Sequence, residues 1–81
     1  MAGPGDERER LSRRLCQILI EARETADLTQ AELGKALGRT QSFVSNYERG
    51  QRKLGVPEFI QIARTLGRDP AAMVTELATK R

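Results

Sequence analysis

The sequence predicts an all-α domain built from five short helices. Apolar residues recur at helical spacing along most of the chain, and capping residues, prolines and glycines divide that pattern into short segments. No segment shows the alternation of a convincing strand. The 81 residues make one domain with a single modest core, which is too small for a two-domain enzyme with a cleft between its lobes.

The first helix is expected over residues 7–26. Its apolar residues form one stripe that braces the rest of the domain. Residues 1–6 carry glycine and proline and are expected to be a disordered N-terminal arm, so the folded domain spans residues 7–81. The stripe consists of Leu11, Leu15, Ile18, Leu19, Ala22 and Ala26.

Two further short helices are expected around a glycine turn. Thr29 can cap the first of them, with Glu32 as its capping-box partner. Gly38 supplies the left-handed residue that ends this helix, and Thr40 can cap the next one, over residues 41–48.

The helix over residues 41–48 has an unusually polar outer face. Val44 and Tyr47 are three residues apart and can share the buried face. An amide side chain on the other face can match the donor and acceptor of an adenine edge in the major groove of DNA, and a short hydroxyl can contact a base or a phosphate. An ordinary amphipathic helix with a solvated polar face is the alternative for this pattern taken alone. The outer residues are Gln41, Ser42, Ser45 and Asn46.

Basic residues follow this helix directly. Arg49, Arg52 and Lys53 fall within five residues with no acid among them, and the whole chain has a net charge of +3. Such a cluster can neutralise phosphates, whereas a solvated loop is the other interpretation.

The fourth helix follows a connection over residues 50–55. Leu54 and Val56 are expected to anchor this connection to the core. Pro57 suits the first turn of a helix, and Gly67 ends the helix. The apolar stripe of this fourth helix consists of Phe59, Ile62, Ala63 and Leu66.

The last helix is expected to begin at Asp69 and Pro70, which provide a cap and a first-turn proline, and to run to about Thr79. Ile60 falls off the stripe of the fourth helix, and with one side of the last helix it suggests an exposed apolar patch. A homodimer is the natural use of such a patch, although a singly exposed isoleucine needs no explanation. The predicted interface residues are Ile60, Met73, Val74 and Leu77.

Several classes of function are disfavoured by composition. The chain has no histidine and only one cysteine, Cys16. A single chain therefore cannot form a zinc site or a disulfide, and it cannot carry out histidine-dependent catalysis. Cys16 is expected to be a small buried or half-buried thiol. The N-terminus lacks an apolar signal-peptide core, and no apolar run reaches membrane-spanning length. We therefore expect a cytoplasmic protein with no metal, no cofactor, no membrane partner and no small-molecule ligand.

The segment from Thr29 to Gly50 resembles the helix-turn-helix DNA-binding domain of the phage repressor and Cro class, also called the xenobiotic-response-element or XRE family. Gln30-Ala31-Glu32-Leu33 matches the start of the motif, Gly38 its turn, and Gln41-Ser42 through Tyr47-Glu48-Arg49-Gly50 its recognition helix. The resemblance extends to most of residues 11–77. Gly34, where the family usually has alanine, and Arg68, where an apolar residue is common, depart from it.

The resemblance implies a five-helix, lambda-repressor-like fold with the helix-turn-helix at helices 2 and 3. It also implies a sequence-specific DNA-binding regulator of the repressor type that acts as a homodimer on double-stranded DNA. The outer residues of helix 41–48 would read bases. The implied backbone contacts are Gln30, Thr40, Arg49, Arg52 and Lys53, and Gln30 would alternatively brace Gln41. Arg23 and Glu48 match a structural ion pair of the family.

The main competing interpretation is an antitoxin or adaptor whose partner is another protein, because the same fold serves such modules. A recognition helix with acids among its outer residues, or without the basic cluster, would favour that interpretation, and neither feature is present. An enzyme is disfavoured, since the sequence has no glycine-rich phosphate loop, metal-ligand set or nucleophile with a base. The residues do not distinguish a phage repressor, a restriction-modification controller, an antitoxin and a general regulator.

Overall fold

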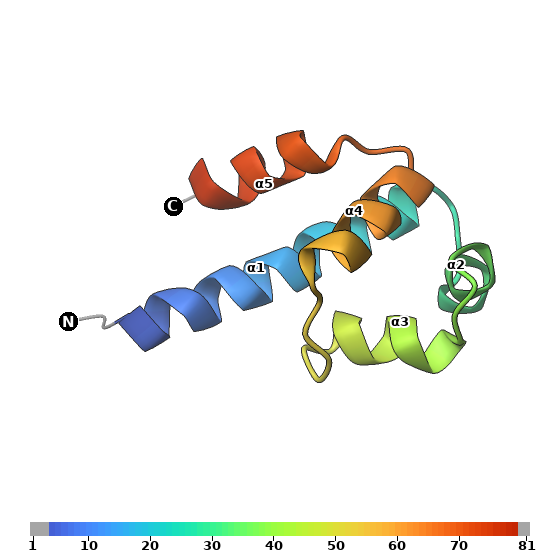
Figure 1. Ribbon diagram of the computed structural model, residues 1–81, viewed down its shortest axis with the longest axis horizontal. Helices are drawn as coiled ribbons and strands as arrows, with labels where there is room; N and C mark the ends of the chain where they lie inside the picture. The colour runs from blue at the N-terminus through green and yellow to red at the C-terminus, as the bar shows by residue number, and fades with distance from the viewer. Residues whose placement is uncertain (1–3, 80–81) are drawn as a thin grey trace.

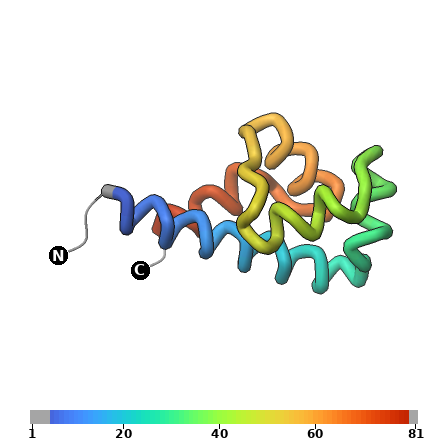
Figure 2. The backbone as a smooth tube through the Cα atoms, turned by 90° about the horizontal axis from the view of Figure 1, so that it is seen from below, coloured from blue at the N-terminus to red at the C-terminus, as the bar shows by residue number. Residues whose placement is uncertain are grey.

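The computed structural model describes residues 4–79, and in this range the chain forms five helices and no strand, as the sequence predicted (Figure 1). The long first helix runs through the domain, while the second and third helices lie at one end of the molecule. The last helix returns alongside the N-terminal half of the first, as both views show (Figure 2). The helices are α1 (Pro4–Thr25), α2 (Gln30–Ala36), α3 (Gln41–Glu48), α4 (Val56–Thr65) and α5 (Pro70–Thr79).

The helix α1 begins at Pro4, earlier than the expected start at Glu7. Proline suits the first turn of a helix, and Asp6 and Glu7 in the same turn interact favourably with the helix dipole. Residues 4–6 are therefore helical rather than part of a disordered arm. Residues 1–3 of that predicted arm lie outside the described residues.

The turn between α2 and α3 has the predicted caps. The Thr29 hydroxyl accepts the Glu32 N–H at 3.0 Å while the Glu32 carboxylate accepts the Thr29 N–H at 2.8 Å, which completes the capping box. Gly38 has the left-handed φ of 70° that ends α2, and the Thr40 hydroxyl caps α3 by accepting the Phe43 N–H at 3.2 Å. These caps fix where α3 begins.

Gly34 allows α2 and α3 to approach closely. A Cβ atom at Gly34 would lie 2.8 Å from the carbonyl oxygen of Thr40, which is backbone and cannot rotate away. The glycine in place of the family's usual alanine therefore fits this crossing, although it lowers intrinsic helix propensity by about 1 kcal/mol.

The core lies between the five helices, each of which contributes buried apolar side chains. Val44 and Tyr47 of α3 are buried, as predicted from their spacing, and the ring of Tyr47 packs edge-on against that of Phe43 with centroids 5.4 Å apart. Burial of these side chains turns the remaining face of α3 outward. The buried apolar residues are Ile18, Leu19, Ala22, Leu33, Leu37, Phe43, Val44, Tyr47, Phe59, Ile62, Ala63, Leu66 and Met73.

Two expectations about apolar side chains are wrong. Val56, expected to anchor the connection, is 70% exposed because it is the first residue of α4, whereas Leu54 is half-buried and packs against the core. Met73, expected in a dimer interface, is only 1% exposed because it faces inward from α5 and completes the core. Val74 beside it is 50% exposed. The apolar surface is thus smaller than the sequence suggested.

The ends of α4 and α5 follow local rules. Gly67 has a φ of 75° after α4, and the Asp69 carboxylate caps α5 by accepting the Ala71 N–H at 3.0 Å. Arg68, a departure from the family pattern, is exposed and its guanidinium lies 3.4 Å from the Glu76 carboxylate on α5. Its charge therefore stays at the surface.

Candidate nucleic-acid interface

The outer face of α3 is polar and accessible at its N-terminal end. Gln41 and Ser42 are exposed, and Ser45 and Asn46, one turn further along, are half-buried. The opposite face of the same helix is held in the core by Val44 and Tyr47. In Figure 1, α3 lies along one side of the molecule, at the bottom of the view. Donor and acceptor groups are thus presented on a rigid element.

Arg49 follows α3 and contacts its outer face. Its guanidinium donates to the Asn46 side-chain oxygen at 2.8 Å and to the Gln51 side-chain oxygen at 3.4 Å. Both partners are neutral, so the charge of Arg49 is not compensated by them. The contact occupies the acceptor of Asn46 and leaves its amide N–H groups as the groups this residue can offer to a ligand.

A second basic cluster, which the sequence did not reveal, lies around Phe43. The guanidinium carbon of Arg39 lies 3.9 Å from the centre of the Phe43 ring, and that of Arg52 lies 5.0 Å from it, in cation–π geometry. Both guanidinium groups also reach one carboxylate oxygen of Glu58, at 3.4 Å from Arg39 and 2.6 Å from Arg52. Arg52 is therefore positioned by an acid, while Lys53 next to it is exposed.

Glu58 has a local role as well. Its other carboxylate oxygen accepts the Gly55 N–H at 3.1 Å, at the start of α4. This backbone hydrogen bond, followed by the nearby Arg52 charge, lowers the pKa of Glu58 below its ordinary value. The position of Glu58 three residues after Gly55 is a capping signal in the sequence. The two arginines that the carboxylate also binds are brought together only by the fold.

The predicted ion pair between Arg23 and Glu48 is present. The guanidinium of Arg23 donates to both carboxylate oxygens, at 2.7 Å and 3.2 Å, and to the carbonyl oxygen of Leu28 at 2.8 Å. The hydrogen bond to Glu48 raises the pKa of Arg23. Glu48 is only 8% exposed, so these donors compensate the contacts with water that its carboxylate loses on burial.

Gln30 also binds Glu48. Its amide nitrogen donates to the Glu48 carboxylate at 2.8 Å, which makes Gln30 the third member of the cluster. The resemblance placed Gln30 on the DNA backbone or against Gln41, but in this structure its N–H group is directed to Glu48. Sequence spacing could not reveal this contact, since the two residues are 18 positions apart.

Cys16 is a half-buried thiol, as expected. Its S–H donates to the carbonyl oxygen of Tyr47 at 3.2 Å, and burial raises the pKa of the thiol. Among residues 4–79 no group of three or more histidine, cysteine, aspartate or glutamate side chains is arranged to hold a metal ion. Within the same residues, no helix combines the length and the apolar character needed to cross a membrane.

Two capped helices around a glycine turn, with the second one polar on its accessible face, define a helix-turn-helix DNA-binding domain. A helix-turn-helix family model matches residues 19–72 of the chain. The chain belongs to this family and is of the XRE type. It is a DNA-binding protein of the class that regulates transcription.

Solved structures give the same assignment. An XRE-family like protein from Pseudomonas syringae pv. tomato str. DC3000 is 42% identical, with a TM-score of 0.84 over 88% of this chain and 87% of that one. The clp gene regulator ClgR from Corynebacterium glutamicum is 25% identical, with a TM-score of 0.76 over 84% of this chain and 72% of that one. No curated protein matches the chain.

Proposed function

We propose that this protein is a sequence-specific transcriptional regulator of the repressor type that reads the major groove with α3 and binds DNA as a homodimer. The observation that carries the proposal is the division of α3 into a buried apolar face and an accessible polar face beside the basic loop. A helix held in this way can enter the groove without losing its packing.

Base contacts are assigned to the polar face. Gln41 and Ser42 are the most accessible of these residues and lie at the N-terminal end of α3. In helix-turn-helix proteins, the N-terminal residues of the recognition helix contact the base edges. Ser45 and Asn46 lie one turn further along α3. The side-chain oxygen of Asn46 accepts a hydrogen bond from Arg49, so Asn46 would offer its amide N–H groups to a base. Glutamine in this set is suited to adenine because it both donates and accepts.

Backbone contacts are assigned to the rim of the same face. Thr40 at the start of α3, and Arg49 and Lys53 after its end, are exposed and flank the base-reading residues. Arg52 and the additional Arg39 would join them if a phosphate replaced Glu58 as their partner. The role proposed for Gln30 is chiefly to orient Glu48 and, through it, the end of α3. Such contacts set register rather than sequence.

The dimer is assigned to an apolar hollow of about 210 Å³ near α5 and the start of α4. Val56 and Val74 are the exposed large apolar residues of the described chain, and both line this hollow. Leu77 also lines it, whereas Ile60 is half-buried against the core and is a peripheral candidate. Met73 is not part of the proposed interface, because its side chain lies in the core.

An antitoxin or adaptor role would use the same apolar hollow for a different protein. The accessible amide and hydroxyl groups of α3 and the adjoining cations favour DNA as the main partner. A regulator of this kind would act in the cytoplasm, without a cofactor or a catalytic step.

To test the proposal, the full chain is used to select bound duplexes from random DNA. Its affinity for the selected duplex is then compared, at fixed salt, with its affinity for a scrambled duplex of equal length. Sequence-specific binding predicts a preference of about 10³-fold or more. Equal binding to both duplexes, or no binding, would contradict the proposal. A reporter gene with the selected site near its promoter then separates repression from activation.

A further inference from the structure

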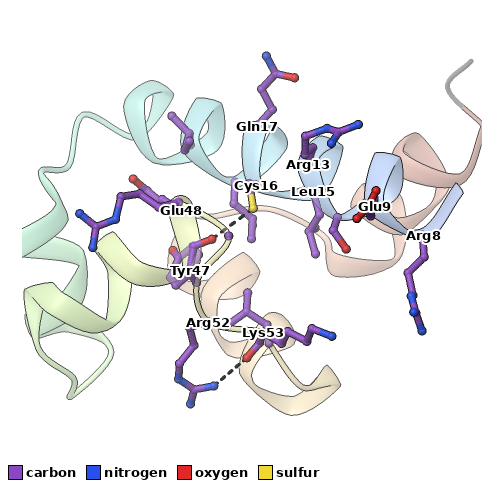
Figure 3. Close-up of a pocket in the computed structure, with 16 residues that line it drawn as sticks. Arg8, Glu9, Arg13, Leu15, Cys16, Gln17, Tyr47, Glu48, Arg52 and Lys53 are labelled. Carbon is purple, nitrogen blue, oxygen red and sulfur yellow. Dashed lines mark hydrogen bonds between the residues drawn. The ribbon is translucent and has the colours of Figure 1, made fainter. Parts of the chain in front are cut away.

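A groove of about 1000 Å³ separates the N-terminal half of α1 from the loop that follows α3 (Figure 3). One wall of the groove is formed by α1 and the other by the segment from Tyr47 to Leu54. Figure 3 shows the Lys53 side chain extending from the loop in the direction of the part of α1 that carries Arg8. The groove adjoins the proposed DNA interface. Its second wall begins in the helix-turn-helix motif, at Tyr47 and Glu48 of α3, whereas the N-terminal half of α1 lies outside that motif.

The groove carries an excess of positive charge. Its lining includes two carboxylates, Glu9 and Glu48, and five cationic side chains, those of Arg8, Arg13, Arg49, Arg52 and Lys53. The Glu48 carboxylate already binds Arg23 and Gln30. Among the cations, Arg52 already pairs with Glu58. The ion pairs found between residues 5 and 79 include none made by Arg8, Arg13 or Lys53.

The part of the α1 wall from Arg8 to Gln17 precedes the segment that the family model matches, which begins at residue 19. With 22 residues, α1 is about 33 Å long, and its N-terminal half projects past α3 and α4 (Figure 1). From Cys16, which contacts Tyr47, to Arg8 the helix rises about 12 Å. That distance corresponds to the axial rise of three to four base pairs, at roughly 3.4 Å per phosphate of one strand.

We propose that this groove binds the phosphate backbone of DNA flanking the recognised half-site, with Arg8 and Arg13 as contacts additional to the helix-turn-helix. The inference rests on the proposed function, because the groove continues from Arg49 and Lys53, which are assigned to the backbone. An open, cationic groove suits a phosphodiester chain. The large apolar side chains exposed in the described chain, Val56 and Val74, line a different hollow, so a second copy fits better there.

The test compares three variants of one helix: Arg8→Gln, Arg13→Gln and the matched control Arg10→Gln. All three remove one charge, and glutamine preserves helix propensity, but Arg10 does not line the groove. Each variant is titrated with salt on the selected duplex with long flanks and on a duplex trimmed to the recognised site. Melting temperatures check that α1 is intact.

On the long duplex, Arg8→Gln and Arg13→Gln should each lower the slope of log affinity against log salt by about 0.9, while Arg10→Gln leaves it close to wild type. On the trimmed duplex all three should match wild type, and hydroxyl-radical protection of the flank should weaken in the two groove variants. An equal loss for Arg10→Gln, a loss that persists on the trimmed duplex, or no loss would overturn the inference. A change in DNA-free sedimentation of the groove variants would assign the groove to a second copy instead. Failure of the wild type to bind any duplex would contradict the proposed function itself.

Discussion

The guanidinium of Arg23 on α1 holds the carboxylate of Glu48 at the end of α3 with two hydrogen bonds, at 2.7 Å and 3.2 Å. Both side chains are largely buried, with 13% and 4% of their surfaces exposed. Arg23 also binds the Leu28 carbonyl oxygen, and Gln30 binds Glu48. The cluster therefore ties α1, the loop after it, α2 and α3 together, and it sets the direction in which the polar face of α3 points.

Removing one partner of this pair should be strongly destabilising. Glu48→Ala leaves the Arg23 charge largely buried without its carboxylate, and we expect a loss of about 3 to 5 kcal/mol in the free energy of unfolding. Urea denaturation measures this loss. Glu24→Ala is the control, at an exposed position of α1, the helix that carries Arg23. A double-mutant cycle with Arg23→Ala that gives no coupling energy would contradict the assignment.

Tyr47→Phe should be tolerated at neutral pH and should remove part of the alkaline sensitivity. The Tyr47 hydroxyl is buried and has no hydrogen-bond partner among the described residues, so its loss should be neutral or stabilising by up to about 1 kcal/mol. Burial, followed by the nearby Glu48 charge, raises the pKa of Tyr47 above its ordinary value of 10.0. As pH rises, Tyr47 therefore ionises in the unfolded chain before it ionises in the folded protein. The stability that depends on the neutral hydroxyl is present below that value and is lost as pH rises above it. Between neutral pH and about pH 11, the free energy of unfolding should fall less in Tyr47→Phe than in wild type. An equal loss in both proteins would contradict the account.

Glu58→Gln should strengthen binding to DNA. The carboxylate of Glu58 engages Arg39 and Arg52 on the proposed DNA-facing side, and a neutral amide would release their charges while still accepting the Gly55 N–H. We expect higher affinity and a steeper salt dependence, by up to about one unit of slope for each additional phosphate that the freed arginines neutralise. Glu76→Gln is the matched control, because Glu76 pairs with Arg14 and Arg68 away from α3. An increase of the same size in both variants would mean that only net charge matters.

Val74→Glu should disrupt the homodimer without disrupting the fold. Val74 is half exposed on α5, and a charge there would be buried without a partner if two copies pack on this surface. Sedimentation should show a weaker dimer, and footprinting should show loss of protection at one of two half-sites spaced by about 10 base pairs. Thr75→Glu, at an exposed position of the same helix, should leave both unchanged. A wild-type protein that stays monomeric at high concentration on and off DNA would remove the dimer from the account.

Local signals in the sequence predicted the elements and most of the core. Caps at Thr29 and Thr40 and the glycine at position 38 act through neighbouring residues, so their effect can be inferred without the fold. The spacing of Val44 and Tyr47 correctly predicted the buried face of α3. The early start of α1 was missed because the glycine at position 5 favours disorder, whereas Pro4 fits the first turn of the helix.

Contacts between distant residues were harder to predict. Periodicity places Met73 and Val74 near one another on α5 but does not show which of them the other helices cover. The grouping of Arg39 and Arg52 on Phe43 depends on how the loop after α3 folds back. The ion pair of Arg23 with Glu48 was predicted only because the family resemblance supplied it.

The central claim, that the exposed face of α3 reads bases, is tested most directly with Gln41→Ala. Gln41 is exposed at the start of α3, so its removal should leave the fold intact and cost about 1 to 3 kcal/mol on the selected duplex, with almost no change on a scrambled duplex. Gln61→Ala, at an exposed position of α4, is the control and should match wild type on both. An equal loss of affinity for Gln41→Ala on the selected and scrambled duplexes would contradict base reading by α3.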